Sequence, residues 1–426
     1  MQFDVCIVGG GLSGLWTAFY LSAASPGLRI AIVEAEFVGF GASGRNGGWL
    51  SSELAGSWAN YAKGEGGQEA VERLENELFA TVDEVIDVCA QEHIDADIIK
   101  SGVLLAARSN AQMARMHSAL SGHSGYSEIP LVEFNDRIRI SGNLGGVFNP
   151  QCARVHPAKL VDGLRRVVQQ RGVTIFEDSR VIDICPGKAS TSRGEVQAPI
   201  ILRCLEGFTA QLSGHKRDWL PMNSAMIATI PLTPAQWDDI GWNGSELLGD
   251  LSNVYFYAQR TADGRIAIGG RGVPYRFASK SDVDGITQER TISSLRRTFD
   301  QLFPSLRQVP LDHAWCGVLG VPRDWCASVG LDQSTGLGWA GGYVGSGLAA
   351  TNLVGRTLRD LVLERPSPLI DLPWTNRTSR RWEPEPLRWI GVSSLYGVYR
   401  AADRHEASGR QQPSWLSTLG NRLAGR

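Results

Sequence analysis

The feature that most constrains this chain is a glycine-rich turn that joins an N-terminal strand to a helix. Residues 3–8 form a short apolar run, which predicts a buried strand. Gly9, Gly11 and Gly14 follow with the spacing G-x-G-x-x-G, and a helix is predicted over residues 12–21. In this motif the first glycine permits a tight turn, the second lets a pyrophosphate approach the backbone, and the third lets helix and strand pack closely. The free N–H groups at the start of the helix are expected to face the phosphates.

The residues after this helix complete a β-α-β unit. A turn at residues 25–27 ends the crossover, and residues 29–33 are predicted to form the second strand. Glu34 ends that strand 20 residues after Gly14, at the position where an acid accepts hydrogen bonds from a ribose. Strand, glycines, helix, strand and acid together predict a dinucleotide-binding unit of the Rossmann kind. The carboxylate of Glu34 disfavours the 2′-phosphate of NADP.

Length, charge and cysteine content limit the kind of protein that this can be and the compartment in which it is expected. A chain of 426 residues predicts two domains, and a formal net charge of −2 provides no general attraction to nucleic acid. The seven cysteines are scattered and include no C-x-x-C pair, so neither a disulfide framework nor a metal site is expected. No apolar stretch approaches the roughly 18 residues that span a bilayer, and the N-terminus lacks the basic region of a signal peptide. These observations favour a cytoplasmic protein.

Two further glycine-rich segments indicate which dinucleotide is bound. Residues 39–48 are polar and predict a flexible loop, and residues 341–355, GGYVGSGLAATNLVG, predict a glycine loop followed by a helix. With these motifs the sequence resembles the glycine/D-amino-acid oxidase (DAO) family of FAD-dependent oxidoreductases. The string GASGRNGG at residues 41–48 is most similar to the γ-glutamylputrescine oxidase-like amine oxidase branch. The resemblance covers residues 3–362 and implies FAD rather than NAD, with the first of these loops lying over the pyrophosphate and the isoalloxazine ring.

The resemblance and the strand pattern predict an α/β fold. A Rossmann-like FAD-binding domain is expected to be interleaved with a β-rich substrate domain built on a mixed sheet. Strand-like runs support the second domain, at residues 102–107, 226–230, 254–258 and 265–268. The predicted division assigns residues 1–85, 147–220 and 310–370 to the FAD-binding domain, residues 86–146 and 221–309 to the substrate domain, and residues 371–426 to a C-terminal helical extension.

The motifs and the resemblance together predict the residues that hold FAD. They lie in the first glycine turn, at the end of the second strand, in the second glycine loop, in two later strands and in the closing motif. The predicted cofactor-binding residues are Gly9, Gly11, Leu12, Ser13, Gly14, Glu34, Ala35, Gly41, Ala42, Ser43, Arg45, Asn46, Gly47, Gly48, Val181, Gly317, Gly342, Gly345, Ser346, Gly347, Leu348 and Ala349. Non-covalent binding is expected. The alternative is a covalent link through Cys316, which lies near the attachment cysteine of some relatives.

The resemblance also implies the reaction. Enzymes of this family transfer a hydride from the carbon beside an amine nitrogen to the flavin, and water hydrolyses the resulting imine to an aldehyde and ammonia. Oxygen then reoxidises the flavin and yields hydrogen peroxide. The candidate catalytic residues are Arg271, Tyr257 and Tyr343. Arg271 or Arg45 is the candidate ligand of a substrate carboxylate, and the tyrosines are candidate walls of an amine pocket.

Two departures from the family bear on the substrate. Sarcosine-oxidase-like relatives carry a lysine near the flavin that assists oxygen, and Ala267 occupies that position here. They carry a second lysine that binds the substrate carboxylate, and Ala349 occupies that one. An amine without an α-carboxylate therefore fits best. A D-amino-acid or N-substituted amino acid dehydrogenase that uses a quinone or another acceptor is the alternative. A flavin-binding partner protein with little catalysis is an alternative of another class.

Several segments carry interpretations that the sequence leaves open. Residues 203–207, RCLEG, depart from the apolar Ala-Thr-Gly-like turn of the family, which puts the adenine-side contacts in question. His156 is interpreted as a helix cap rather than a catalytic group. Tyr255 and Tyr257 share one face of a predicted strand, so either both line the pocket or both lie in the core. Residues 387–400 predict an amphipathic helix that docks on the protein's own surface or on a second subunit. Contact with a membrane surface is the less favoured reading.

Overall fold

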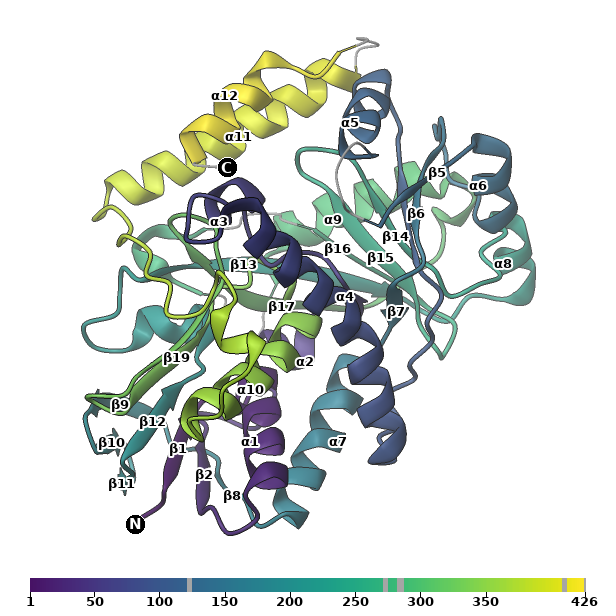
Figure 1. Cartoon of the computed structure of the whole chain (residues 1–426). Coiled ribbons are helices and arrows are strands. Elements are labelled where there is room, and N and C mark those ends of the chain that lie inside the picture. The colour runs from purple at the N-terminus through teal and green to yellow at the C-terminus, as the bar shows by residue number, and fades with distance from the viewer. Residues whose placement is uncertain (121–124, 271–274, 282–286, 408–411, 425–426) are drawn as a thin grey trace.

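The computed structural model describes residues 1–120, 125–270, 275–281, 287–407 and 412–424 (Figure 1). A six-stranded sheet with the order β18-β19-β12-β1-β2-β8 occupies the lower part of that view. Strands from β19 to β8 run parallel, and β18 pairs antiparallel to β19. The strands are β1 (Val5–Val8), β2 (Ile30–Val33), β8 (Thr174–Phe176), β12 (Ile200–Arg203), β18 (Ser328–Asp332) and β19 (Leu337–Gly341).

Alternate side chains of the central strand enter two different cores. Val5 and Ile7 pack in the core that lies under the helices, whereas Cys6 and Val8 pack against a smaller sheet with the order β11-β10-β9. Both faces are therefore covered, which explains why strand β1 is apolar throughout. The covering elements are α1 (Leu12–Ala24), α4 (Gly67–Gln91), α7 (Pro157–Gln170), α10 (Gly347–Val362), β9 (Val181–Cys185), β10 (Lys188–Thr191) and β11 (Gly194–Gln197).

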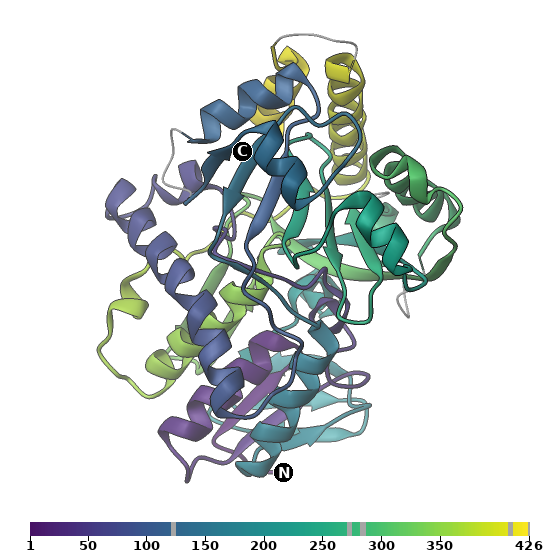
Figure 2. The same cartoon turned by 90° about the vertical axis from the view of Figure 1, so that its right-hand side faces the viewer.

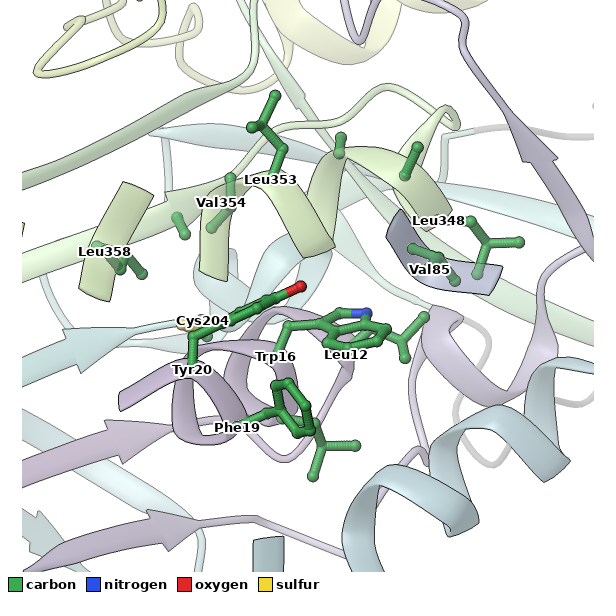
Figure 3. Close-up of a cluster of buried hydrophobic side chains, with 14 of the residues drawn as sticks. Leu12, Trp16, Phe19, Tyr20, Val85, Cys204, Leu348, Leu353, Val354 and Leu358 are labelled. Atoms are coloured by element: carbon green, nitrogen blue, oxygen red, sulfur yellow. The ribbon is translucent and has the colours of Figure 1, made fainter. Parts of the chain in front are cut away.

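The first helix and the closing helix α10 pack directly on each other, and Figure 3 shows side chains of both in one apolar cluster. Trp16 of α1 stacks on Tyr20 at 5.9 Å between ring centroids and meets Phe19 edge-on at 5.6 Å. A Cβ added to Gly355 of α10 would lie 2.8 Å from the carbonyl carbon of Trp16. Glycine at this position therefore permits the close approach of the two helices, and the packing brings both of their N-termini to one edge of the sheet.

The second large sheet has eight strands and is mixed. Its order is β17-β13-β16-β15-β14-β4-β6-β5; β14 and β4 pair parallel and the other neighbours antiparallel. All four strand-like runs expected for the substrate domain lie in it. The strands are β4 (Val103–Ala106), β5 (Ser127–Ile129), β6 (Gly146–Asn149), β13 (Trp219–Thr229), β14 (Leu247–Asp250), β15 (Phe256–Arg260), β16 (Ile266–Gly270) and β17 (Leu311–Pro322).

This sheet has its own core, which includes the buried rings of Trp242, Phe299 and Phe303. The predicted α/β class, with one parallel-type sheet and one mixed sheet, is confirmed. The predicted domain boundaries stay a prediction. The remaining helices and strands are α2 (Ala42–Arg45), β3 (Trp49–Ser51), α3 (Trp58–Tyr61), α5 (Asn110–Leu120), α6 (Leu131–Arg137), β7 (Cys152–Arg154), α8 (Pro234–Ile240), α9 (Glu289–Leu302), α11 (Leu387–Ala407) and α12 (Trp415–Ala424).

The second glycine-rich loop is more regular than the sequence predicts. Residues 39–48 contain the one-turn helix α2, whose last turn is closed by Asn46. The Asn46 amide donates to the carbonyl oxygen of Ser43 at 2.8 Å, and its Oδ1 accepts from the backbone N–H of Gly48, also at 2.8 Å. The expectation of a flexible loop without a packed element was wrong, because a polar side chain supplies the hydrogen bonds that hold this short turn.

The C-terminal helices α11 and α12 pack side by side on the end of the molecule distant from the N-terminus (Figures 1 and 2). Val392 and Tyr396 of α11 are buried in a cluster with Leu220 of β13 and Val321 of β17. The predicted helix is present, and it docks on the protein's own surface, as favoured above. None of the helices in the described ranges is both long and apolar enough to cross a membrane.

Candidate active site

A cavity of about 430 Å³ lies at the carboxyl ends of strands β1 and β2, and its wall includes residues from both large sheets. One part of the wall consists of the glycine turn, the end of β2, helix α2 and the N-terminus of α10. The other part consists of side chains from β14 and β15 and from the segment after β3. Ligands of open α/β sheets bind at the carboxyl ends of the strands, so the position fits a nucleotide-binding site.

The three motif glycines have steric reasons to be glycine. Gly9 has φ +113°, and a Cβ there would lie 2.5 Å from the carbonyl oxygen of Cys204. A Cβ on Gly14 would lie 2.1 Å from the carbonyl oxygen of Gly9, and one on Gly11 would lie 2.8 Å from Ser43 Oγ. The backbone of α1 therefore comes close to β1, and Leu12 and Ser13 at its start line the cavity. This is the cradle that a pyrophosphate requires.

Glu34 stands at the end of β2, on the cavity wall. Its carboxylate accepts from the backbone N–H of Gly10 at 2.8 Å and from that of Glu36 at 3.0 Å. Burial raises the pKa of this carboxyl group, although the two backbone N–H groups partly offset that rise. Its role as the acceptor of the ribose hydroxyl groups, predicted from its spacing, stays a prediction.

Helix α2 is joined to helix α1 and to strand β17 of the eight-stranded sheet. Ser43 Oγ accepts from the backbone N–H of Leu12 at 2.8 Å, so the second glycine segment caps the first helix. The guanidinium of Arg45 lies 4.4 Å from the centre of the Phe40 ring, and Trp315 Nε1 of β17 donates to the carbonyl oxygen of Arg45 at 2.9 Å. These contacts fix the loop, and several of its residues line the cavity.

The closing motif is held by a glutamate that the sequence analysis treated only as a departure. Glu206 accepts from the backbone N–H of Gly320 at 2.9 Å and from that of Gly342 at 2.6 Å. Burial raises the pKa of Glu206 to about 7. Arg203, the other unexpected charge, points elsewhere and contacts His215 Nδ1 at 2.8 Å. The partners of Glu206 among the described residues are backbone N–H groups, which carry no sequence signature, so the sequence offered no more than a glutamate in a turn after a buried strand.

The other part of the cavity wall contains aromatic rings and two acids. Trp49 meets Tyr257 edge-on at 6.2 Å, and the Tyr257 hydroxyl is hydrogen-bonded to Ser224 Oγ at 2.8 Å. Tyr255 also lines the cavity, so the two tyrosines form a wall rather than a core.

The two acids are Glu53 and Asp250, which sequence reasoning missed. Glu53 is accessible from the cavity, and its carboxylate accepts from the hydroxyl of Tyr126 at 3.3 Å. Desolvation of the carboxyl group by the surrounding protein raises its pKa. Burial likewise raises the pKa of Asp250 to about 6, and its carboxylate accepts from the hydroxyl of Ser252 at 2.5 Å. No sequence motif distinguished these two acids from surface carboxylates.

The structure brings most of the predicted site residues to one cavity. Among the candidate catalytic residues, Tyr257 and Tyr343 line it, while Arg271 lies outside the described residues. The Tyr343 hydroxyl is already hydrogen-bonded to Ser13 Oγ at 2.7 Å, which ties the closing motif to α1. The predicted cofactor residues that line the cavity are Gly9, Gly11, Leu12, Ser13, Glu34, Ala35, Gly41, Ala42, Ser43, Arg45, Asn46, Gly47, Val181, Gly317, Gly345, Ser346, Gly347 and Leu348.

Four predicted cofactor residues lie behind that lining. Gly14 packs against Gly9, a Cβ on Gly48 would lie 2.2 Å from the carbonyl oxygen of Val155, and Gly342 donates to Glu206. Ala349 is buried in the first turn of α10. These residues shape the backbone around the cavity.

Two other candidates are placed by their hydrogen bonds. His156 is the N-cap of α7 and accepts from the backbone N–H of Lys159 at 3.4 Å, which confirms the capping interpretation. Cys316 is buried in β17, and its thiol lies 3.4 Å from the carbonyl oxygen of Gly317. It lines a smaller cavity of about 210 Å³ that shares Arg45 and Phe40 with the main one.

Comparison with known proteins identifies the family. The model of the FAD dependent oxidoreductase (DAO) family matches residues 4–361. The chain is 27% identical over 377 residues to the probable oxidoreductase OrdL of Haemophilus influenzae, which covers 84% of this chain and 83% of that protein. It is 26% identical over 374 residues to the gamma-glutamylputrescine oxidoreductase of Escherichia coli, with the same coverage of both chains. The structure of glycine oxidase from Geobacillus kaustophilus superposes with a TM-score of 0.72, at 18% identity, over 89% of this chain and 100% of that one.

The chain therefore belongs to the FAD dependent oxidoreductase (DAO) family, as its motifs suggested. It is an FAD-dependent oxidoreductase of the group that acts on amine and amino acid C–N groups. The cavity fits the cofactor: three glycines leave room for the pyrophosphate, Glu34 is positioned for a ribose, and the N-terminus of α10 faces the space beyond. The cofactor of the family is FAD, and its non-covalent attachment in this chain stays a prediction.

Proposed function

We propose that the protein oxidises the C–N bond of an amine that lacks an α-carboxylate. FAD, when bound, accepts a hydride from the carbon beside the nitrogen; the imine is hydrolysed to aldehyde and ammonia, and oxygen restores the flavin with formation of hydrogen peroxide. The cofactor would be held by the glycine turn, Glu34, helix α2 and the N-terminus of α10. The positive end of the α10 dipole suits the negative charge that gathers on a reduced flavin.

The observation that carries the proposal is the charge of the substrate half of the cavity. Glu53 and Asp250 add two carboxyl groups to that lining, which also includes the rings of Trp49, Tyr255 and Tyr257. Carboxylates and aromatic faces attract an ammonium group and repel a carboxylate. Such a lining favours an amine over an α-amino acid.

The basic side chains of the cavity belong to its other half. Among the described residues that line it, the arginines are Arg45, which lies against Phe40, and Arg180, which pairs with Glu36 at 2.8 Å. Both stand beside the nucleotide-binding segments. Ala349, which replaces the carboxylate-binding lysine of some relatives, is buried in α10 and offers no charge. The name of the gamma-glutamylputrescine relative also refers to an amine.

In this proposal the chain's own groups bind and orient the substrate, and no dedicated base is required if the reacting amine is neutral. Asp250 and Glu53 hold a positive charge on the substrate. The hydroxyl of Tyr257, fixed by Ser224, and the ring of Trp49 orient the carbon that is oxidised. Tyr343 lines the cavity but holds α1 through Ser13, so its role is to position the closing motif.

The alternative function is a D-amino-acid or N-substituted amino acid dehydrogenase that passes electrons to a quinone or another acceptor. One observation favours it: Ala267, which stands where related oxidases carry a lysine that assists oxygen, is buried with Met226 and Ala228 in a small apolar cluster beside Tyr257. In that case amino acids bleach the flavin and air does not restore it.

Conservative variants of the two acids test the proposal. With 1,4-diaminobutane as the probe, whose second amino group stays an ammonium, Glu53→Gln and Asp250→Asn should each raise KM about tenfold, since a hydrogen bond to a charged group contributes roughly 1.5–3 kcal/mol. Asp183→Asn, an exposed acid on β9, is the matched control. Unchanged KM values in both acid variants, with FAD content equal to that of the wild type, would sink the proposed amine site.

A further inference from the structure

The C-terminal helices lie outside the segment that defines the family. The family match ends at residue 361, whereas α11 spans Leu387–Ala407 and α12 spans Trp415–Ala424. Figures 1 and 2 both show these helices beside α5, at the end of the molecule that holds the eight-stranded sheet. Their contacts with the loop between β14 and β15 suggest more than surface docking.

That loop is bounded by two residues that line the substrate half of the cavity. It comprises residues 251–255, with Asp250 immediately before it and Tyr255 at its end, and both of these line the cavity. The position of the loop therefore sets the position of one acid and one ring of the proposed amine site.

Helix α11 holds the centre of this loop through Asp403. One carboxylate oxygen accepts from the backbone N–H of Asn253 at 2.9 Å and from its side-chain Nδ2 at 2.8 Å. The other accepts from the backbone N–H of Val254 at 3.0 Å. A single side chain thus fixes two consecutive amides, and hydrogen bonds to a charged acceptor are stronger than neutral ones.

A buried ion pair holds the start of the same loop. Arg115 of α5 donates through Nε to the carbonyl oxygen of Leu251 at 2.8 Å. Its other two nitrogens donate to both oxygens of Glu406, at 2.9 and 2.7 Å. The Glu406 side chain is only 3% exposed and also accepts from the backbone N–H of Ser414. Helices α5 and α11 and the loop therefore form one connected unit.

The connection continues from α5 to the cavity. Gln112 Nε2 donates to Ser252 Oγ at 3.0 Å, and the Ser252 hydroxyl donates to the Asp250 carboxylate. The anchoring of α11 to the β13 and β17 strands lies nearer its N-terminal end, at Val392 and Tyr396. The contacts near its C-terminal end, at Asp403 and Glu406, therefore hold the loop and are separate from this anchoring.

We propose that α11 is part of the substrate site, and that Asp403 is a positioning residue which sets substrate affinity by fixing residues 251–255. The identity of the substrate as an amine rests on the function proposed above, but the positioning role does not. Asp403 is not among the described residues that line the cavity, and its carboxylate is hydrogen-bonded to Asn253 and Val254, so its loss should leave FAD binding unchanged.

The test compares Asp403→Ala with Arg404→Ala in the FAD-bound enzyme. Arg404 is an exposed neighbour on the same helix and, among the described residues, donates to the carbonyl oxygen of Arg400. The panel of compounds comprises 1,4-diaminobutane, butylamine, sarcosine and D-alanine. With the member that reduces the flavin fastest, Asp403→Ala should raise KM about tenfold and change kcat less than twofold. Amide hydrogen exchange should accelerate at Asn253 and Val254 and in the adjoining residues Asp250 and Tyr255.

A double variant separates positioning from general destabilisation. If Asp403 acts through Asn253, then Asn253→Ala should raise KM less in the Asp403→Ala protein than in the wild type. Additive effects, or an Asp403→Ala protein with the KM and exchange rates of Arg404→Ala, overturn the proposal. Faster exchange with unchanged KM also overturns it, because the loop would then not set affinity.

The two proposals fail in different ways. If amino acids but no amine reduce the flavin, the proposed function fails, and the same KM comparison is made with D-alanine. If no compound of the panel reduces the flavin, the proposed function fails, and exchange at Asp250 and Tyr255 decides the positioning role. Acceleration there in Asp403→Ala supports it and equality with the control overturns it.

Discussion

Replacing Gly14 by alanine tests the physical basis of the cofactor site without touching the proposed substrate half. The added Cβ would lie 2.1 Å from the carbonyl oxygen of Gly9 and 3.1 Å from Ile7 Cγ2. Normal contact between a carbon and an oxygen requires about 1 Å more, so α1 must move away from β1. Because the first contact is with backbone, no side-chain rotation relieves it. Overpacking of this kind costs about 1–3 kcal/mol.

The displacement also moves the amides that face the pyrophosphate, so binding of FAD should weaken as well as folding. The flavin content per chain and the thermal midpoints of apo- and holoprotein measure the two effects. Gly27→Ala is the control, because nothing lies within 4 Å of a Cβ at that position. A Gly14→Ala protein with full flavin content and the stability of Gly27→Ala would refute the reasoning from close packing.

Three further predictions concern titration and attachment. The pKa of Asp250 is raised to about 6, so the carboxylate that binds an ammonium forms as pH rises through 6. In steady-state assays the KM for 1,4-diaminobutane should therefore fall between about pH 5 and 7, and Asp250→Asn should abolish this fall. The same raised pKa means that the folded state prefers the neutral acid, so the contribution of Asp250 to stability is present at low pH and lost as pH rises through 6. Denaturant unfolding of the apoprotein should therefore show Asp250→Asn gaining on the wild type as pH rises from about 4 to 6, with no further gain above that. Cys316→Ser should retain yellow colour, and acid precipitation of wild type should release its FAD into the supernatant; flavin that stays with the pellet would indicate a covalent link.

Sequence alone predicted the parts of the fold that depend on local pattern. The first β-α-β unit follows from apolar runs and glycine spacing, which are visible over residues 3–34. Helix α2 was missed because its stability depends on one side chain, Asn46, that supplies hydrogen bonds within a glycine-rich segment. Such side-chain caps are not distinguishable from loop polarity in one sequence.

The residues of the candidate site also fall into those that a local sequence pattern predicted and those that it did not. Glu34 was predictable because the distance along the chain from the glycine motif is fixed by the β-α-β geometry. Glu53, Asp250 and Glu206 were not, because their significance comes from segments that meet only in the folded chain. Asp403 is a further case, since the sequence gives no sign that a C-terminal helix contacts a loop 150 residues earlier.

The most direct test of the central claim is the visible spectrum of the anaerobic, FAD-bound protein during addition of amines and amino acids, followed by air. The account predicts that an amine such as 1,4-diaminobutane or butylamine bleaches the flavin band, that sarcosine and D-alanine do so far more slowly, and that air restores the colour with release of hydrogen peroxide. Rapid bleaching by amino acids alone, or flavin that no compound reduces, would contradict it.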